Sequence, residues 1–422
     1  MTPVEKMRTV MTAIATMSPS ASFASIIDAK REAFHGMHVA YATHSHDSYV
    51  QQVRMDQIET ECALVCRLFD GSGLLFYSDE IYRDMRHGPA RIMLDFSIGL
   101  DKNVCDNIRR YVEGKAIDRP DDLRTLLQMV RGRQDQDFNY DFFAYLVEEY
   151  EHVFVPNNDR PGKTMFALKV LDHIDEVAIS RFPLSPLTSS IHDKAWREAQ
   201  EALSWFIANG SLSAFQLDQR AIYAVLLKGL QIRWKEVPIN QTLGELARFS
   251  LQTLGKLAKR EIYFAWKMIG GDGTVYPFFQ PAFAHSEKSL KKLKGISWDL
   301  TMLRWAETMS GMRRAVRGEM SDFFIPFVAS HDRRFREMVN ACPLKAIIVD
   351  HRTKNMNVVY RDELAYQVAL QEQMARASIT LGSPQDQVRR LRAPLNKARI
   401  ENTIAELEME ACRFLGKPDV NC

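Results

Sequence analysis

The chain has few cysteines and none of the spacings that build a disulfide framework or a zinc site. Its six cysteines are scattered over 422 residues, and no CxxC pair occurs. Both kinds of cross-link require denser and more regular spacing. We therefore expect reduced thiols and a cytoplasmic protein, with the thiols at Cys62, Cys66, Cys105, Cys342, Cys412 and Cys422.

A membrane-spanning segment and a strong charge of one sign are also missing. No stretch offers the roughly 18 consecutive apolar residues that a membrane helix needs, so we expect no membrane partner. The 55 Lys and Arg residues nearly balance the 53 Asp and Glu residues, which leaves a net charge of +2. The overall charge therefore indicates no partner, whereas a hydrophobic content of 46% supplies a substantial core.

Short apolar runs predict a few buried strands. One run, at 90–95, ends in Asp95, and two further runs occupy 323–329 and 344–349. The last two bracket a short predicted helix at 332–340. This order is typical of a parallel strand–helix–strand crossover.

Turn residues and helical periodicity organise the rest of the chain. In the segment 61–77, two apolar runs flank Asp70-Gly71-Ser72-Gly73, which is typical of a β-hairpin. An edge strand is expected at 353–361. The predicted helices are 101–114, 120–132, 141–153, 193–208, 218–232, 243–268 and 297–310, with a charged helical tail at 384–415 that is broken near Pro394.

Acidic side chains occupy positions where a sheet protein can bring them together. Asp95 and Asp332 follow apolar runs, and in an open parallel sheet ligands bind outside the carboxyl ends of the strands. Asp299 begins a predicted helix, and Glu148 lies on another. Clustered carboxylates repel one another unless a cation neutralises them, and an all-oxygen set selects Mg²⁺ or Mn²⁺.

Each aspartate taken alone has an ordinary structural explanation. Asp95 suits a turn, Asp299 suits the first turn of a helix, and Asp332 suits a helix cap. The ordered set, with two of the three at the ends of apolar runs, favours a shared function.

The segments around these aspartates are similar to a known family. IMLDFSIGLDKNV resembles the first strand and following turn of PIN-domain nucleases, where an aspartate ends the strand and a helix follows. FFIPFVASHDRRF resembles the late strand of that family, and ISWDLTMLRWAE is similar to its helix-starting aspartate. The three patches, 90–114, 297–306 and 322–350, follow the order of the family and cover about a third of the chain.

The resemblance implies a metal-dependent ribonuclease. By that resemblance Asp95, Asp299 and Asp332 would ligate Mg²⁺ or Mn²⁺ and act in catalysis. The family also places an acidic residue on an intervening helix, and Glu148 is the first choice for it. Glu149 and Glu261 are the alternatives for that acidic residue. Asp101 could take part as a further acidic residue next to the site.

The implied fold belongs to the α/β class. It is a small parallel sheet flanked by helices (PIN-like), with a large, mainly helical insertion, an N-terminal β-hairpin region and a helical C-terminal tail. The insertion is required because about 200 residues separate Asp95 from Asp299. The expected segments are an N-terminal region at 1–89, the first part of the core at 90–154, the insertion at 155–290, the second part of the core at 291–361 and the tail at 362–422.

Basic residues lie near two of these aspartates. Residues 285–319 contain eight Lys or Arg against four Asp or Glu. Basic groups beside an acidic metal centre would hold phosphates by charge, with little sequence preference. We expect Lys292, Lys294, Arg333 and Arg334 to bind the substrate, although a single lysine is more often part of a solvated helix face.

The preferred hypothesis is therefore a metal-dependent endoribonuclease that hydrolyses RNA phosphodiester bonds, for example as a toxin, a defence effector or an RNA-processing factor. One alternative is a non-enzymatic helical interaction protein whose aspartates are caps and turn formers. Another is a metal-dependent phosphatase, which keeps the carboxylates but does not need the basic surface. The charged tail helix could pair with a second copy of the chain.

Overall fold

The chain forms two compact units, distinguished by the contacts within it. The helical unit comprises Met1–Phe34, Ser213–Thr301 and Val359–Cys422, and the sheet unit comprises His35–Leu212 and Met302–Val358. The computed structural model describes residues 1–18, 22–44, 62–88, 90, 92–131, 139–153, 155–181, 184, 186–208, 211–270, 272–284, 286, 288–311, 315–316, 319–353 and 355–415.

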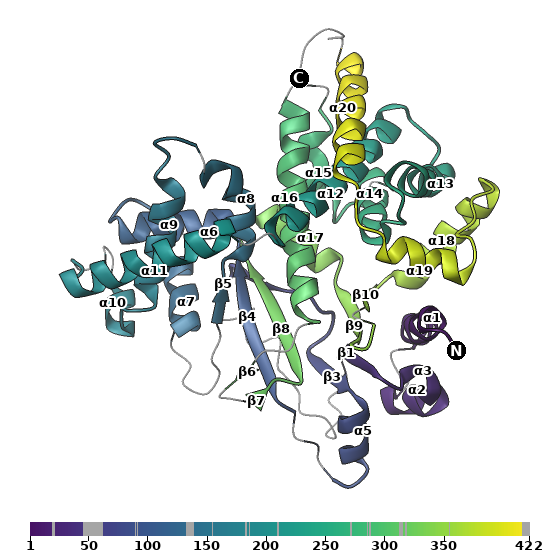
Figure 1. Cartoon of the computed structure of the whole chain (residues 1–422), viewed down its shortest axis with the longest axis horizontal. Helices are drawn as coiled ribbons and strands as arrows, with labels where there is room; N and C mark the ends of the chain where they lie inside the picture. Colours follow the sequence, from purple (N-terminus) through teal and green to yellow (C-terminus); the bar gives the residue numbers. More distant parts are fainter. Residues whose placement is uncertain are drawn as a thin grey trace. The chain divides into compact units, whose positions relative to one another are not determined.

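The strands form two four-stranded sheets and a two-stranded ribbon (Figure 1). They are β1 Met37–Thr43, β2 Val65–Arg67, β3 Gly73–Tyr77, β4 Leu94–Leu100, β5 Asn139–Asp141, β6 Ala315–Val316, β7 Glu319–Met320, β8 Phe323–Ala329, β9 Leu344–Asp350 and β10 Asn355–Tyr360. One sheet has the order β2-β8-β4-β5 and is mixed, and the other has the order β10-β9-β1-β3. The chain is thus of the α/β class, as expected, but parallel pairing between strands is confined to β8, β4 and β5 among the described residues.

β4 is the central strand of the parallel part of the mixed sheet. It pairs in parallel with β5 on one side and with β8 on the other. The register with β8 runs from Leu94 opposite Phe323 to Leu100 opposite Ala329. All seven residues of β8 are buried, as is usual for parallel strands with both faces covered. The pairing brings the carboxyl ends of β4 and β8 to the same edge of the sheet.

The two apolar runs of residues 61–77 do not form the expected hairpin. β2 pairs with β8 in the mixed sheet, whereas β3 pairs with β1 in the other sheet. The turn between them lies against the end of β1, where the Ser72 amide donates a hydrogen bond to the Thr43 carbonyl over 3.0 Å. The prediction is wrong because a turn signal indicates only that the chain reverses, and tertiary contacts decide which strand each run joins.

The expected crossover is also wrong in its sheet assignment. β8, α17 (Arg333–Ala341) and β9 follow one another as predicted, but β9 pairs antiparallel with β1 rather than joining β8. A single parallel bridge between Phe69 and Leu344 connects the residues after β2 with the start of β9. β10 is an edge strand, as predicted.

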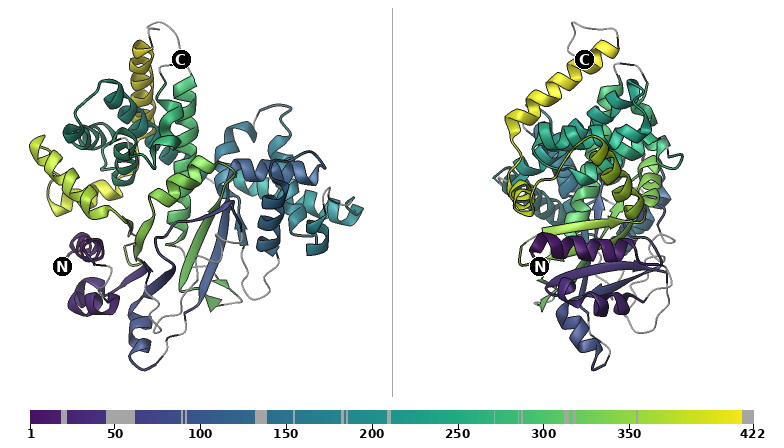
Figure 2. Two further views of the ribbon diagram at one scale, coloured as in Figure 1. Left: turned by 180° about the vertical axis from the view of Figure 1, so that it is seen from behind. Right: turned by 90° about the vertical axis from the view of Figure 1, so that its right-hand side faces the viewer.

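In the sheet unit, the helices of residues 102–208 gather beside β4 and β5 (Figures 1 and 2). α6 begins directly after β4 and contacts α8 and α9, and α11 packs on α9. The helices expected between residues 101 and 208 are all present, with shifted ends. The described helices of this unit, besides α17, are α5 Asp79–Met85, α6 Lys102–Val112, α7 Pro120–Arg131, α8 Phe143–Val153, α9 Arg160–Leu171, α10 Glu176–Ser180 and α11 Ser189–Ala208.

The helical unit contains the remaining described helices, and α16 continues from it into the sheet unit. The α-helices are α1 Pro3–Ala15, α2 Phe23–Ala29, α3 Arg31–Phe34, α12 Ser211–Trp234, α13 Ile239–Phe249, α14 Lys259–Gly270, α15 Tyr276–Phe279, α16 Lys288–Met309, α18 Glu363–Arg376, α19 Pro384–Arg392 and α20 Lys397–Phe414. A π-helical turn, η1 Ser250–Leu254, and a 3₁₀ turn, η2 Gln280–Ala282, complete the set.

Two helices of this unit differ from the sequence prediction. The helix expected at 243–268 is interrupted after η1, because Gly255 takes a left-handed conformation with φ of 78°, which usually ends a helix. The helix expected at 297–310 is the second half of α16, which begins at Lys288. Leu290, Leu293 and Ile296 are buried, so the apolar face continues toward the N-terminus of this helix.

The tail helix α20 uses its apolar face inside the helical unit. Arg220 of α12 forms a two-pronged ion pair with Glu401, and the Gln231 side-chain amide donates to the Leu407 carbonyl over 2.8 Å. The Tyr223 hydroxyl donates to Glu408 over 2.8 Å. The structure therefore gives no support to pairing of this helix with a second copy of the chain. The break before it, between α19 and α20, is present as predicted.

The expected insertion does not form a body of its own. Its residues up to Leu212 belong to the sheet unit, and those from Ser213 onward belong to the helical unit. A PIN-like core with one inserted domain is therefore not confirmed by these contacts.

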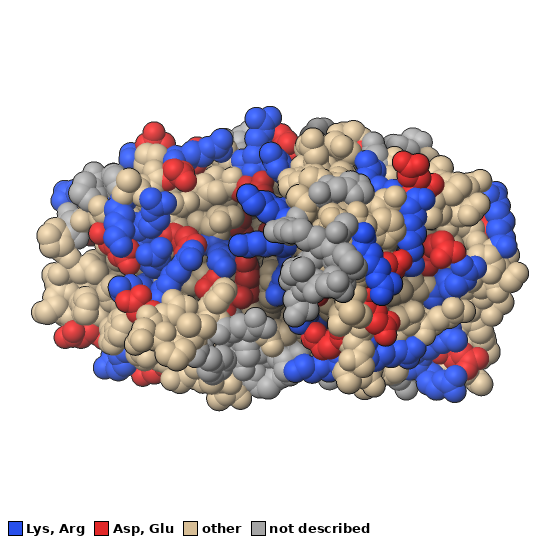
Figure 3. Space-filling view, turned by 90° about the horizontal axis from the view of Figure 1, so that it is seen from above, with Lys and Arg blue, Asp and Glu red and all other residues tan. Residues whose placement is uncertain are grey.

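Charged side chains of both signs are intermingled on the face that Figure 3 shows, in keeping with the net charge of +2. Among the described helices, none combines the length and apolarity required to cross a membrane. Cys62, Cys66, Cys105 and Cys342 are buried free thiols, as expected, whereas Cys412 is disulfide-bonded.

Gly71 provides a test of the turn between β2 and β3. Its φ is 85°, and a Cβ added there would lie 2.4 Å from the Thr43 carbonyl oxygen. We expect Gly71→Ala to lower the urea midpoint of unfolding strongly, because the clash adds to a left-handed backbone penalty of about 1–2 kcal/mol. Gly36→Ala is the matched control, since Gly36 has φ of 79° but open space around its Cα. Equal losses in the two variants would contradict the close approach of this turn to β1.

Candidate functional site

Each of the three parallel strands carries an aspartate at or just beyond its carboxyl end. Asp101 follows β4, Asp141 is the last residue of β5, and Asp332 lies three residues beyond β8. Ligands of open α/β sheets bind outside this edge. We therefore take the edge formed by Asp101, Asp141 and Asp332 as the candidate site.

Ser330 joins two of these aspartates through hydrogen bonds. Its hydroxyl donates to Asp101 Oδ2 and accepts the backbone N–H of Asp332 over 3.0 Å. The Asp101 backbone N–H donates to the Ala329 carbonyl over 3.0 Å. Residues 101 and 332 are thus held on either side of one serine, although 231 positions separate them in the sequence.

The same aspartates cap the helices that follow. Asp101 Oδ1 accepts the Val104 N–H over 2.7 Å at the start of α6. Asp332 Oδ1 accepts the Arg334 N–H over 2.8 Å at the start of α17. Both carboxylate oxygens of Asp141 accept hydrogen bonds, one from the Phe143 backbone N–H and the other from the Trp305 indole N–H. No hydrogen bond within the described residues engages Asp332 Oδ2.

Asp101 is the electrostatically perturbed member of the site. Burial raises the pKa of its carboxyl to about 7, and the negative charges of Glu148 and Asp332 act in the same direction. The hydrogen bonds from Ser330 and Val104 oppose this rise without cancelling it. Such a shift, with burial and like charges as its causes, marks candidate functional sites.

Glu148, the first choice for the helical acid, does lie near Asp101. Lys102, the first residue of α6, places its Nζ 3.4 Å from Glu148 Oε1 and also contacts Glu149. Burial raises the pKa of Glu148, and the charge of Lys102 opposes that rise. One lysine therefore offsets the charge of this glutamate pair beside the strand ends.

The prediction that Asp95 ends a strand is wrong. Asp95 is the second residue of β4, opposite Phe324, and five residues separate it from Leu100 at the carboxyl end. At about 3.3 Å per residue this is roughly 16 Å. Its carboxylate is buried and accepts the Phe96 N–H over 2.9 Å. Asp95 and Asp332 therefore cannot share one ion.

Asp299 does not begin a helix either. It lies in the middle of α16, because that helix starts at Lys288. Asp299, Lys292 and Lys294 belong to the helical unit, as does Glu261 on α14. They are therefore not part of the site at the strand ends as the sheet unit forms it.

The sequence before Asp101 contains the pattern of a strand that ends there, although the apolar run at 90–95 is more conspicuous. In LDFSIGLD, residues Phe96, Ile98 and Leu100 alternate with smaller residues, which is the period of a strand that ends just before Asp101. The run at 90–95 was favoured because it is more continuously apolar. Asp141 had no comparable signal, since β5 has only three residues.

The arginines expected to bind substrate next to Asp332 are exposed on α17. Arg333 pairs with Glu337 along the helix over 2.7 Å. Neither Arg333 nor Arg334 lines the groove beside Asp332. The cations in that groove come instead from α6 and α9, two helices that sequence reasoning did not connect with the site.

An open polar groove of about 560 Å³ lies beside Asp332, and we call it the α6 groove. One face of α6 contributes four of its residues at the helical spacing i, i+3, i+4 and i+7. The others come from α6 itself, from the segment between α6 and α7, from α9 and from the residues that follow β8. The groove is lined by Asn103, Asp106, Asn107, Arg109, Arg110, Asp118, Arg160, His331 and Asp332.

His331 contributes a neutral ring to this groove. Its Nε2 is buried and has no hydrogen-bond partner among the described residues. Burial lowers the pKa of the imidazole, and the positive charges of Arg336 and Arg119 act in the same direction. The ring is therefore mainly uncharged at pH 7.

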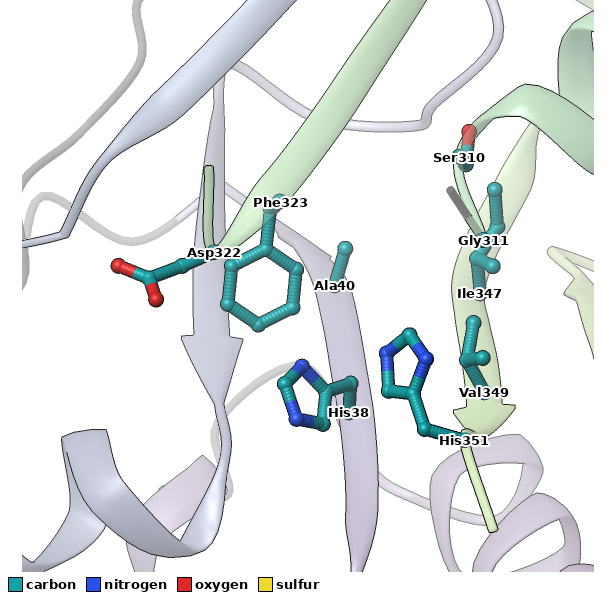
Figure 4. Close-up of a pocket in the computed structure, with 9 residues that line it drawn as sticks. All are labelled: His38, Ala40, Ser310, Gly311, Asp322, Phe323, Ile347, Val349 and His351. Carbon is teal, nitrogen blue, oxygen red and sulfur yellow. The ribbon is translucent and has the colours of Figure 1, made fainter. Parts of the chain in front are cut away.

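A second cavity in the sheet unit is too small for a substrate. It lies between β1, β8 and β9 and has a volume of about 10 Å³, close to the least that holds one water. His38 and His351 face one another with ring centroids 4.3 Å apart, while the Asp322 carboxylate points away from them (Figure 4). This cavity does not compete with the α6 groove as a functional site.

The raised pKa of Asp101 predicts how stability depends on pH in the absence of metal. The folded protein binds the proton of Asp101 more tightly than the unfolded chain, so the wild type should lose stability as pH rises from about 4 through 7. Asp101→Asn keeps a capping oxygen and removes this loss. We expect its stability relative to wild type to increase with pH, by at most about 1.4 kcal/mol for each pH unit.

Urea unfolding in EDTA at pH 5 and pH 8 measures this difference. Asp159→Asn is the control, because a hydrogen bond from Lys163 lowers the pKa of the exposed Asp159 carboxyl. That variant should show no gain in relative stability at pH 8. The same pH response in both variants would contradict the burial of Asp101.

Comparisons with known proteins indicate no family or function for this chain, so its function is argued from its own residues. No protein-family model, no curated protein and no solved structure matches this chain.

Proposed function

We propose that the protein is a divalent-metal-dependent hydrolase that cleaves RNA phosphodiester bonds at the carboxyl ends of β4 and β8. The observation that carries the proposal is the pair Asp101 and Asp332, which parallel pairing and Ser330 hold together at the edge where α/β sheets bind ligands. Asp101 replaces Asp95 as the first aspartate of the site.

Assigning Asp101 instead of Asp95 as the first aspartate preserves the resemblance to PIN-domain nucleases. The family resemblance calls for an aspartate that ends a strand and is followed by a helix. Asp101 has that position, directly between β4 and α6. It lies within the same quoted segment, IMLDFSIGLDKNV. Asp299 belongs to the helical unit, so the proposal does not include it among the ligands of this site.

The donor set suits Mg²⁺ or Mn²⁺. Asp101 and Asp332 offer carboxylate oxygens. Burial, with a smaller contribution from the charges of Glu148 and Asp332, raises the pKa of Asp101, and a bound cation would favour its ionised form. Among the described residues, no three acidic, histidine or cysteine side chains lie close enough to hold a metal ion. Mg²⁺ does not require three, because one or two carboxylates usually hold it together with waters and substrate phosphates.

The residues of the chain would divide the work as follows. Asp101 and Asp332 would hold the ion, and Ser330 would orient Asp101 by donating to its Oδ2. Lys102 would keep the charges of Glu148 and Glu149 from adding fully to that of the metal-binding pair. A bound divalent ion supplies an activated water and stabilises the charge that develops on phosphate oxygens.

The main alternative, a helical interaction protein, interprets these aspartates as helix caps. Capping does account for Asp332 Oδ1 and Asp101 Oδ1. It does not account for the open polar groove beside them, which favours a site for a small ligand or a segment of a polymer.

Cleavage of a labelled RNA in Mn²⁺ tests the proposal. We expect Asp101→Asn and Asp332→Asn to reduce cleavage at least about 100-fold, because each removes a charged ligand but keeps a capping oxygen. Asp95→Asn should retain cleavage per folded molecule, since Asp95 lies at the other end of β4. Circular dichroism checks that each variant is folded.

Two results would overturn the proposal. One is the absence of metal-dependent cleavage by the wild type. The other is full activity in Asp101→Asn together with loss of activity in a folded Asp95→Asn, which would place the reaction at the opposite end of β4.

A further inference from the structure

The α6 groove runs away from the strand ends along one helix. Asn103, Asn107 and Arg110 lie on the same face of α6, and that helix begins directly after Asp101. With a rise of 1.5 Å per residue, Arg110 lies about 13 Å along the helix axis from Asp101. A chain-like ligand that reaches Asp332 at one end of the groove can therefore extend along α6 toward Arg110.

Arg110 is the cation that this groove leaves available. Arg160 forms a two-pronged ion pair with Asp106, and Arg109 contacts Asp106 and pairs with Glu113 over 2.9 Å. Arg110 forms no ion pair with the described residues. Its guanidinium has five donors in a planar fork that matches phosphate oxygens.

The other polar groups of the groove can both donate and accept hydrogen bonds. Asn103 and Asn107 make no side-chain hydrogen bond with the described residues, and both line the groove, where Asn107 is 7% exposed. The Nε2 atom of His331 is likewise buried in the groove wall and has no hydrogen-bond partner among the described residues. Groups of this kind contact base edges and sugar hydroxyls, which single-stranded RNA leaves open.

We propose that the α6 groove binds a single-stranded segment of RNA beside the cleaved bond, with Arg110 holding a flanking phosphate. The inference rests on the proposed function for the identity of the polymer. A volume of about 560 Å³ falls in the range of sites for one small ligand, which corresponds to about one or two nucleotides. In a duplex the Watson–Crick edges of the bases are paired with one another, so Asn103 and Asn107 could not contact those edges.

Binding measured without cleavage tests this assignment. A fluorescently labelled ten-nucleotide oligouridylate is titrated with the full chain in EDTA, and anisotropy is recorded over a series of salt concentrations. We expect Arg110→Gln to weaken binding about 3- to 10-fold at low salt and to reduce the salt slope by about 0.7, the value for one phosphate contact on a single strand.

Arg197→Gln is the matched control. Arg197 is an exposed arginine on α11 of the same unit and, like Arg110, makes no ion pair with the described residues. It should leave both affinity and salt slope unchanged. Equal behaviour of the two variants would overturn the assignment, as would RNA that fails to bind the wild type.

Competition separates single strands from duplexes. An unlabelled RNA duplex of the same length should compete at least ten times more weakly than the unlabelled single strand. Asn107→Ala should narrow that difference, because it removes a contact to base edges that Watson–Crick pairing occupies in a duplex. Equal competition by duplex and single strand would overturn the assignment.

Failure of the inference and failure of the proposed function give different results. If the wild type binds the oligonucleotide through Arg110 but cleaves no RNA in Mn²⁺, hydrolysis is excluded and the binding groove stands. If it cleaves RNA while Arg110→Gln leaves affinity, salt slope and KM unchanged, the groove assignment is excluded and hydrolysis stands.

Discussion

The parallel pairing of β4 with β8 is the constraint on which the site depends. The register that sets Leu100 opposite Ala329 places Asp101 beside Ser330, and the Asp101 N–H continues the pairing by donating to the Ala329 carbonyl. A slip of one residue would turn every side chain of β4 to the other face of the sheet and separate the aspartates. The start of α6, and with it the polar face that lines the groove, follows directly from where β4 ends.

The pairing of β4 with β8 holds the Asp101 carboxyl in a buried position that disfavours its charged form. A buried carboxyl with neighbouring negative charges favours its protonated form, and the pKa of Asp101 rises accordingly. Lys102 lies close enough to offset Glu148 and Glu149, but Asp101 receives only hydrogen bonds from Ser330 and Val104. Folding energy alone would favour an amide at this position. In the proposed hydrolase, a cation bound to this carboxylate would relieve the cost.

Elements that depend on the local sequence pattern were predicted well, whereas the pairing of strands was not. Helices such as α6 and α17, and the strands β8 and β9, follow from periodicity and caps within a few residues of the expected ends. The hairpin between β2 and β3 does not, because each run joins a different sheet. Asp332 was found because an apolar run ends just before it. Asp101 is predicted to have only an outer role, because the apolar run at 90–95 places the end of the strand five residues before its observed end at Leu100.

The sequence by itself determined the α/β class, most helices and the presence of acidic residues after apolar runs, because these depend on neighbours close along the chain. Only the tertiary structure decided which strands pair, which end of β4 meets Asp332, and that arginines of α6 and α9 rather than α17 line the groove. Those outcomes depend on contacts between segments more than 200 residues apart, such as β4 and β8. The period of a single strand carries no information about its partner or its register.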